Sequence, residues 1–159
     1  MGSGLEARDI ITIKTDPYHY IRGVAEVMKI NPATLAPPVM GLYSQIAVAS
    51  KARLAFIAGQ VAIDRHGEFV GHADYGAQAR QCFLNIAAAI QAVGAQPSDL
   101  LRMTVHVVNH QPELIAVIFN AGKEVFPGTW PSPASTYLGV ASLALPEWLI
   151  EIDAVVGLP

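Results

Sequence analysis

The feature that most constrains this chain is the alternation of apolar and acidic residues in WLIEIDAVV, residues 148–156. Ile150 and Ile152 share one parity of this segment, and Glu151 and Asp153 share the other. A period of two is typical of a strand that buries one face. An acidic side chain in so apolar a strand has to face water, a cleft or a partner, because burying an unpaired charge is costly. The alternation therefore predicts a half-buried strand with an open acidic face, and a solvated sheet face is its simplest interpretation.

The rest of the chain carries further strand and helix patterns. Strands are predicted over residues 45–49, 53–58, 102–108, 134–141 and 148–156, and helices over 77–93 and 112–126. The first two strands are expected to form a hairpin, and a turn that contains Pro146 joins the last two. This order predicts an α+β domain with two helices on one face of a mixed sheet. The other face is then left open, which favours association with another copy of the chain.

The segment before the first hairpin is set apart by its prolines. Residues 1–38 are predicted to be an N-terminal extension with a short strand over 10–14, a short helix and a linker, and residues 39–159 the main domain. The helix would begin after Asp16 and end at Asn31-Pro32. It has apolar residues at helical spacing: Ile21, Val24, Ala25 and Met28.

Composition narrows the class of protein. Hydrophobic residues make up 52% of the chain and charged residues 14%, a balance that predicts a partner over part of the apolar surface. The net charge is −3 and no cluster of Lys or Arg occurs, so nucleic-acid binding through phosphates is disfavoured. Cys82 is the one cysteine and permits no internal disulfide. Without an apolar run that could span a bilayer, a soluble cytoplasmic protein is expected.

The motifs of common catalytic classes are missing from the sequence. It has no phosphate-binding glycine loop, no HExxH, no paired cysteines and no GxSxG, so neither a metal nor a cofactor is expected. Cys82 lies on the core stripe of a predicted helix, which disfavours it as a nucleophile. His106 has no acidic or hydroxyl partner nearby in sequence and is interpreted as a packed or interface residue. Glu151 remains, and with tyrosines and small hydroxyls it could activate a water or hold a small polar ligand.

Four segments together resemble one protein family. They are YSQIAV from Tyr43, FIAGQVAID from Phe56, QARQCFLNIAAAIQAVGA from Gln78, and PASTYLGVASLALPEWLIEIDA from Pro133. In this order and spacing they are similar to the Rid (reactive intermediate deaminase) family, also called L-PSP endoribonuclease-like. The resemblance implies a chorismate-mutase-like α+β fold and a homotrimer with an inner β-barrel and three clefts between subunits. In such clefts, active relatives hydrolyse enamines or imines derived from amino acids without a metal or cofactor.

The resemblance also assigns roles to individual residues. Glu151 matches the glutamate that positions the water, and Tyr43, Gly59 and Asn85 match positions that line or support the cleft. Where the family has an arginine that clamps the substrate carboxylate, in a PAR motif, this chain reads PAST.

Two substitutions in this segment bear on the substrate. Ser135 takes the place of the family arginine, and Tyr137 stands where a cysteine or another small residue is usual. A charge-assisted hydrogen bond is worth roughly 1.5–3 kcal/mol. Affinity for amino-acid imines is therefore expected to fall by about tenfold to a hundredfold.

Three functions are compatible with these residues. The preferred hypothesis is a Rid-type hydrolase for a substrate without an α-carboxylate, in which Glu151 orients water and Ser135 and Tyr137 bind polar groups. The second is a trimeric protein that binds a small molecule without catalysis. The third is an endoribonuclease, which the acidic pI of about 5.9 disfavours. Imine hydrolysis would return to favour if the cleft held another cation, for which the candidates are Arg53, Arg102 and Lys123 of a partner subunit.

Overall fold

A computed structural model describes residues 26–35, 38, 41–50, 53–128 and 130–158. Its elements are β1 (Glu26–Ile30), β2 (Ile46–Ser50), β3 (Arg53–Gln60), α1 (Tyr75–Ala92), β4 (Leu100–Val108), α2 (Leu114–Val125), β5 (Ala134–Val140) and β6 (Ile150–Leu158), with a 3₁₀ turn at Pro97–Asp99. Each strand and helix predicted between residues 45 and 156 is confirmed, with ends that differ by a few residues. The predicted strand over 10–14 and the beginning of the predicted N-terminal helix lie outside the described residues.

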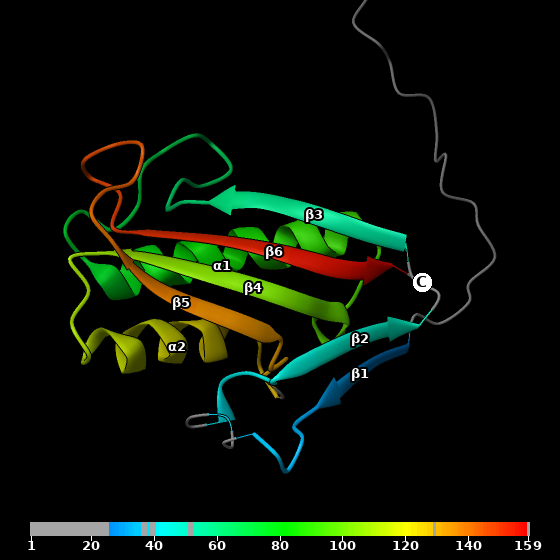
Figure 1. Ribbon diagram of the computed structural model, residues 1–159. Coiled ribbons are helices and arrows are strands. Elements are labelled where there is room, and N and C mark those ends of the chain that lie inside the picture. Colours follow the sequence, from blue (N-terminus) through cyan, green and yellow to red (C-terminus); the bar gives the residue numbers. More distant parts are fainter. Residues whose placement is uncertain (1–25, 36–37, 39–40, 51–52, 129, 159) are drawn as a thin grey trace, which may run out of the picture.

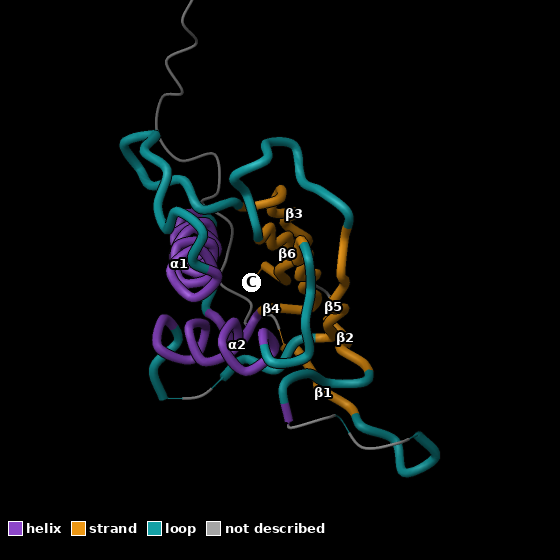
Figure 2. Tube along the Cα trace, turned by 90° about the vertical axis from the view of Figure 1, so that its left-hand side faces the viewer, coloured by secondary structure: helices purple, strands orange, loops and turns teal. Residues whose placement is uncertain are grey.

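The main sheet has four strands in the order β3-β6-β4-β5. β6 is antiparallel to both β3 and β4, whereas β5 runs parallel to β4 after the crossover through α2. Both helices lie on the same side of this sheet (Figure 2). The mixed α+β architecture with two helices on one face is therefore confirmed.

Two predicted pairings are wrong. β2 and β3 do not form a hairpin: β2 pairs with β1 in a separate two-stranded ladder, and β3 pairs with β6 (Figure 1). β5 and β6 are both strands, but β4 lies between them. The chain makes these pairings over long sequence separations, and the strand period alone gives no partner.

The helix predicted for the N-terminal extension is wrong where the structure can be compared with it. Residues 26–30 form β1, in which Met28 pairs with Val48 and Ile30 with Ile46. A short isolated helix is marginal, whereas cross-strand pairs of large apolar residues stabilise a ladder. β1 thus joins the predicted extension to a strand of the predicted main domain; the boundary at residue 38 stays a prediction.

The core lies between the sheet and the helices. On β4 the buried parity is Met103, Val105 and Val107, and on β6 it begins with Ile150 and Ile152, all at most 1% exposed. Opposite them, α1 contributes Cys82, Phe83, Ile86 and Ile90, which are also at most 1% exposed. The strand parity predicted from the alternation in β6 is confirmed.

An aromatic cluster joins α1 and α2 at one end of this core. Phe83 of α1 makes edge contacts with Phe126 and Trp130. Gly122 of α2 lies against the same rings: a Cβ there would come within 2.8 Å of both Phe83 and Trp130. The absence of a side chain at residue 122 therefore permits close packing of α2 on the cluster.

No described helix covers the second face of the sheet. The outward residues there include Phe56, which is 77% exposed, Leu54 and Leu138, besides the acidic residues of β6. Exposed apolar side chains of this kind are common at association surfaces, and the association with another copy of the chain stays a prediction. In the parts of the chain that the structure describes, no helix combines the length and hydropathy needed to cross a bilayer.

Candidate functional site

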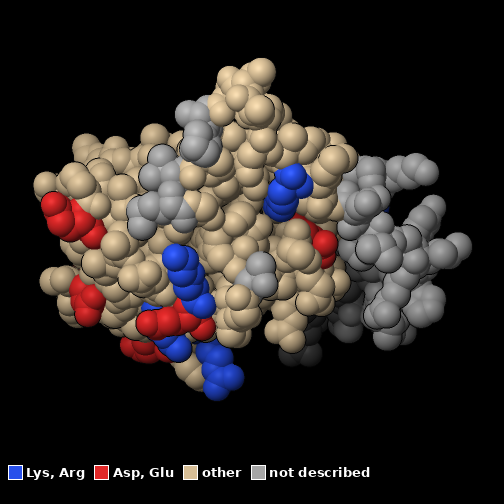
Figure 3. Space-filling model, turned by 90° about the horizontal axis from the view of Figure 1, so that it is seen from below, with Lys and Arg blue, Asp and Glu red and all other residues tan. Residues whose placement is uncertain are grey.

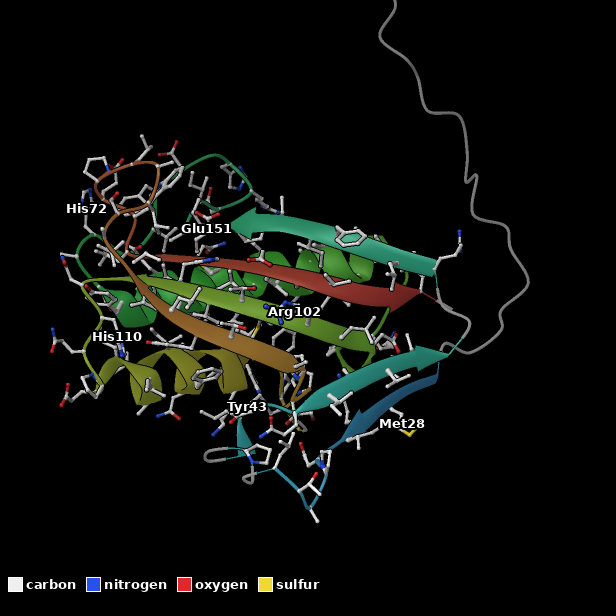
Figure 4. All side chains as sticks on the ribbon, viewed as in Figure 1. Met28, Tyr43, His72, Arg102, His110 and Glu151 are labelled. Atoms are coloured by element: carbon white, nitrogen blue, oxygen red, sulfur yellow. The ribbon has the colours of Figure 1, made fainter. Side chains whose placement is uncertain are left out.

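Glu151 lies on the open face of β6, near the end of β3 (Figure 4). Its carboxylate rests on the backbone of Gly59: a Cβ atom at residue 59 would lie 1.8 Å from Oε1. The register of β3 against β6 shifts between Ile57 and Gln60, so the ladder is irregular at this point. Gly59 therefore leaves room for the carboxylate, as its predicted position in a cleft requires.

Asn85 of α1 supports the segment that follows Gly59. Its Nδ2 donates to the carbonyl oxygens of Val61 and Ile63, at 3.0 and 2.9 Å. Its Oδ1 accepts a 2.8 Å hydrogen bond from Gln81. Both the nitrogen and the oxygen of the Asn85 amide are thus hydrogen-bonded. The bonds to Val61 and Ile63 hold the segment after Gly59 against α1.

A histidine and a second carboxylate stand next to Glu151 on the open face. His106 of β4 is directly opposite Glu151 in the strand register. Its Nδ1 lies 3.9 Å from Oδ2 of Asp153, and this nitrogen is buried without a hydrogen-bond partner. The sequence alone indicates no partner for His106, because Glu151 and Asp153 are far away from it in the chain. The alternation of β4, which puts His106 and Thr104 on the parity opposite the core residues, was the available signal.

Ser135 and Tyr137 lie on the other side of the sheet from Glu151. Between them, Thr136 pairs with the outward Thr104, so both neighbours of Thr136 turn toward the helices. Ser135 Oγ donates to the carbonyl of Pro133 at 3.2 Å. The structure of a single chain does not bring these two predicted residues together with Glu151, and their roles stay predictions.

Tyr137 belongs to the aromatic layer under β5. Its ring stacks on Phe119 of α2, and its hydroxyl lies 3.3 Å from Nδ1 of His110. Burial raises the pKa of Tyr137 to about 12. The hydroxyl is therefore a neutral hydrogen-bonding group at physiological pH.

Tyr43 lies far from Glu151, near the start of β5 (Figure 4). Its neighbour Ser44 is tied to the segment before β5, because the Ser44 amide donates to the carbonyl of Pro133 at 3.1 Å. Within one subunit, the predicted site residues other than Asn85 of α1 thus form two groups. We call Glu151 with Gly59 the carboxylate group, and Tyr43 with Ser135 and Tyr137 the β5 group.

Neither predicted cation of this chain lies beside Glu151. Arg102 is on the open face, but its Nη2 donates to Thr136 Oγ1 at 3.0 Å and it pairs with Val155 of β6. Four residues of strand, about 13 Å, separate Val155 from Glu151. Arg53 pairs with Leu158, still farther along β6. Within the described ranges, no group of three His, Cys, Asp or Glu residues is placed to hold a metal ion.

Comparison with known proteins gives consistent matches over most of the chain. A family model described as "Endoribonuclease L-PSP" matches residues 33–157. A "RutC family protein" of Pyrococcus horikoshii is 33% identical over 76% of this chain and 90% of its own. A "2-iminobutanoate/2-iminopropanoate deaminase" of Dermatophagoides farinae is 27% identical over 80% of this chain and 94% of its own.

A solved structure supports the same assignment. A protein of unknown function from Yersinia pestis, described as a member of the conserved Rid family, superimposes with a TM-score of 0.75. It is 38% identical in sequence, and the match covers 83% of this chain and 98% of that one. Sequence and fold therefore agree with the resemblance of the four segments, and the chain belongs to the Rid family.

Proposed function

We propose that this protein is a Rid-type hydrolase that cleaves an enamine or imine in clefts between the subunits of a homotrimer. The observation that carries the proposal is the carboxylate of Glu151, held over Gly59 on an open sheet face. The similarity to a protein named as an imine deaminase supports the reaction class.

Two features support a cleft between subunits. Ser135 and Tyr137 of the β5 group lie on the face of the sheet opposite to Glu151, so a cleft that uses both groups needs two copies of the chain. The open face also carries the exposed side chains of Phe56, Leu54 and Leu138, whose burial would stabilise an assembly. Closing the open faces of three copies around an axis would form the inner barrel.

Hydrolysis of an imine requires a base that accepts a proton from the attacking water. Water adds to the imine carbon while Glu151 accepts one of its protons, the electron pair of the C=N π bond moves to nitrogen, and nitrogen takes up a proton to give the carbinolamine. Glu151 then gives its proton to the nitrogen as the C–N bond breaks, and the hydroxyl group loses its proton as the C=O bond forms, so that ammonia and a carbonyl compound leave. General-base assistance of this kind contributes about 10²- to 10⁴-fold to a rate.

The substrate that suits this site lacks an α-carboxylate. Ser135 is neutral and bonded to the Pro133 carbonyl, and Arg102 is engaged with Thr136. Neither places a permanent positive charge close to Glu151. A second carboxylate, Asp153, stands two residues from Glu151 on the same face, which further disfavours an anionic substrate.

The test compares two imines formed in place by an amine oxidase or an amino-acid oxidase: one without a carboxylate, and 2-iminopropanoate. Loss of the imine and release of ammonia are measured. We expect the carboxylate-free imine to be hydrolysed with a kcat/KM at least about tenfold higher, since the arginine is missing. Equal or faster turnover of 2-iminopropanoate would contradict the proposed substrate class.

Two variants address Glu151 directly. Glu151→Gln should lower kcat by about 10²-fold or more, because the amide accepts no proton from water. Gly59→Ala should lower kcat as well, because the new Cβ displaces the carboxylate while the fold persists. Glu124→Gln, at an exposed position of α2, is the matched control and should leave the rate unchanged. An unchanged rate in Glu151→Gln would exclude the hydrolase as proposed.

One observation favours the non-catalytic alternative. Ser135 and Tyr137 both already have partners in the single chain, in Pro133 and His110. A binding protein would hold the carboxylate-free imine or its ketone product without turnover, and Glu151→Gln would then change affinity alone. Calorimetric titration with the ketone, beside the rate assay, separates the two functions.

The charge distribution of the protein gives an RNA-cleaving function less support than the two functions above. The net charge is −3, and on the face shown in Figure 3 Lys and Arg side chains lie beside Asp and Glu. Phosphate-backbone binding depends on gathered positive charge.

A further inference from the structure

The open face holds a second group that can transfer a proton beside Glu151. His106 is the residue opposite Glu151 on the neighbouring strand, and Asp153 is two positions farther along β6. Directly opposed residues of an antiparallel pair have Cβ atoms roughly 5 Å apart. The Glu151 carboxylate leans toward Gly59 of β3, so a small substrate bound over β6 would lie between this carboxylate and the His106 ring.

The unbonded ring nitrogen of His106 indicates that Asp153 is its partner. Nδ1 is buried and without a hydrogen bond, although 29% of the side chain remains exposed. An orphaned buried nitrogen costs free energy, so it indicates an interaction that is incomplete in the single chain. Oδ2 of Asp153, at 3.9 Å, is the acceptor in ion-pair range. A movement of about 1 Å would convert this contact into a hydrogen bond.

We propose that Asp153 and His106 form a dyad that acts with Glu151 in the hydrolysis, an inference that rests on the proposed function. Asp153 accepts a hydrogen bond from Nδ1–H and is a positioning residue. This bond fixes the tautomer and leaves Nε2 of His106 to exchange protons with the substrate. The reaction then has a proton acceptor and a proton donor on adjacent strands.

The proton transfers balance over one turnover. When the C–O bond forms, Glu151 takes a proton from water, and protonated His106 gives one to the imine nitrogen, which has received the π electrons. When the C–N bond breaks, its electron pair leaves with nitrogen, and Glu151 returns its proton to that nitrogen. His106 takes the hydroxyl proton as the C=O bond forms. Ammonia and a carbonyl compound leave, and both side chains are back in their starting states.

The surroundings of the ring match this role. β6 presents Glu151 and Asp153 to it, and on its other side β5 presents Leu138, which is apolar. Thr104 and Val108 are its same-face neighbours along β4. Of the charged side chains that the structure describes on these three strands, the two carboxylates are those next to the ring.

The first test determines the tautomer of the His106 imidazole in the absence of substrate. Long-range ¹H–¹⁵N NMR of the full-length protein, at a pH where the ring is neutral, shows which ring nitrogen carries the proton. We expect Nδ1–H for His106, and a shift toward Nε2–H in Asp153→Asn, whose amide can donate to a bare Nδ1. A proton on Nε2 of His106 in the wild type, unchanged in Asp153→Asn, would overturn the dyad.

The second test reads catalysis on the carboxylate-free imine. His106→Ala should lower kcat by about 10²-fold with KM nearly unchanged, because the lost contact acts in the transition state. Added imidazole should restore part of this rate, which a structural role for the ring would not permit. Asp153→Asn should lower kcat by about tenfold. His66→Asn removes an exposed histidine from the loop after β3 and serves as the control.

The outcomes separate this inference from the proposed function. If Glu151→Gln is inactive while His106→Ala and Asp153→Asn keep full kcat, the hydrolase stands and the dyad is wrong. If the wild type releases ammonia from neither imine, the proposed function fails, and with it the catalytic role of His106. The NMR measurement still decides in that case whether Asp153 and His106 are paired.

Discussion

The two faces of the four-stranded sheet are built from alternate residues of the same strands, yet they differ in almost every property. On β6, Ile150 and Ile152 are completely buried against the helices, whereas Glu151 and Asp153 between them are partly exposed on the open face. The buried parity contributes stability through packing. The residues of the open parity do not pack in the core, so they can be ionisable. Alternate residues of one strand therefore serve stability and the candidate site separately.

The largest expected effect is on the covered face. Phe83→Ala should lower the free energy of unfolding by about 3–5 kcal/mol, because Phe83 is fully buried and the lost ring leaves a cavity against Phe126 and Trp130. Urea denaturation followed by tryptophan fluorescence measures the loss. A loss below about 1 kcal/mol would mean that the two faces do not differ in packing as described.

Phe56→Ala is the matched substitution on the open face, where the same side chain is 77% exposed. In dilute protein it should change the free energy of unfolding by less than about 1 kcal/mol. At high concentration it should weaken association, because Phe56 is the most exposed large apolar side chain among those that the structure describes on the open face. Sedimentation velocity at several concentrations checks both statements. An identical sedimentation profile for wild type and variant would remove Phe56 from the proposed interface.

An effect smaller than that of Phe83→Ala, but larger than that of Phe56→Ala, is expected from one of a pair of helical glycines. Gly122→Ala on α2 should cost about 1–3 kcal/mol, because the new Cβ meets the rings of Phe83 and Trp130. Gly76→Ala in the first turn of α1 has room, with its closest contact at 3.4 Å, and should be neutral or stabilising by up to about 1 kcal/mol. Thermal unfolding of both variants is the measurement. Equal effects would show that α2 can move away from the cluster at little cost.

The smallest effect concerns the ladder beside the sheet. Burial lowers the pKa of Lys29 in β1 to about 8, against an opposing attraction from Asp99, while its Nζ donates to the carbonyl oxygen of Leu100. The ordinary pKa is 10.5, so the folded state disfavours the charged amine. The penalty for burying the charged amine is fully present below pH 8. It decreases as the pH rises from 8 toward 10.5, because the amine of the folded state loses its proton first.

The wild type should therefore gain stability relative to Lys29→Met between pH 8 and pH 9.5, by less than about 1 kcal/mol because the side chain is partly solvated. Paired urea titrations of the two proteins at each pH measure the difference. A wild type that loses stability relative to the variant over this interval would contradict the burial of Lys29.

Local pattern predicted most elements because their periods are strong. The stripe of α1, which includes Cys82 and Ile86, and the alternation of β6 each specify an element and its buried side. Partner choice was not predictable in the same way. The insertion of β4 between β5 and β6, and the pairing of β3 with β6, depend on contacts between segments far apart in the chain.

The arrangement of the candidate site was likewise not predictable from local sequence pattern. The resemblance identified Glu151 and Gly59, and the structure places them in contact. It did not indicate that Ser135 and Tyr137 face the helices, because relating the parity of β5 to that of β6 requires the intervening register with β4. The partners of His106 were not predictable for the same reason. Its neighbours Glu151 and Asp153 are adjacent only after β4 and β6 have paired.

The irregular end of β3 has a consequence beyond the placement of Glu151. β3 is an outer strand of the four-stranded sheet, and a regular outer strand offers a row of free amides and carbonyls on which a foreign strand can add. The shifted register between Ile57 and Gln60 breaks that row. The extra residue that seats the carboxylate therefore also interrupts the edge to which such a strand would add.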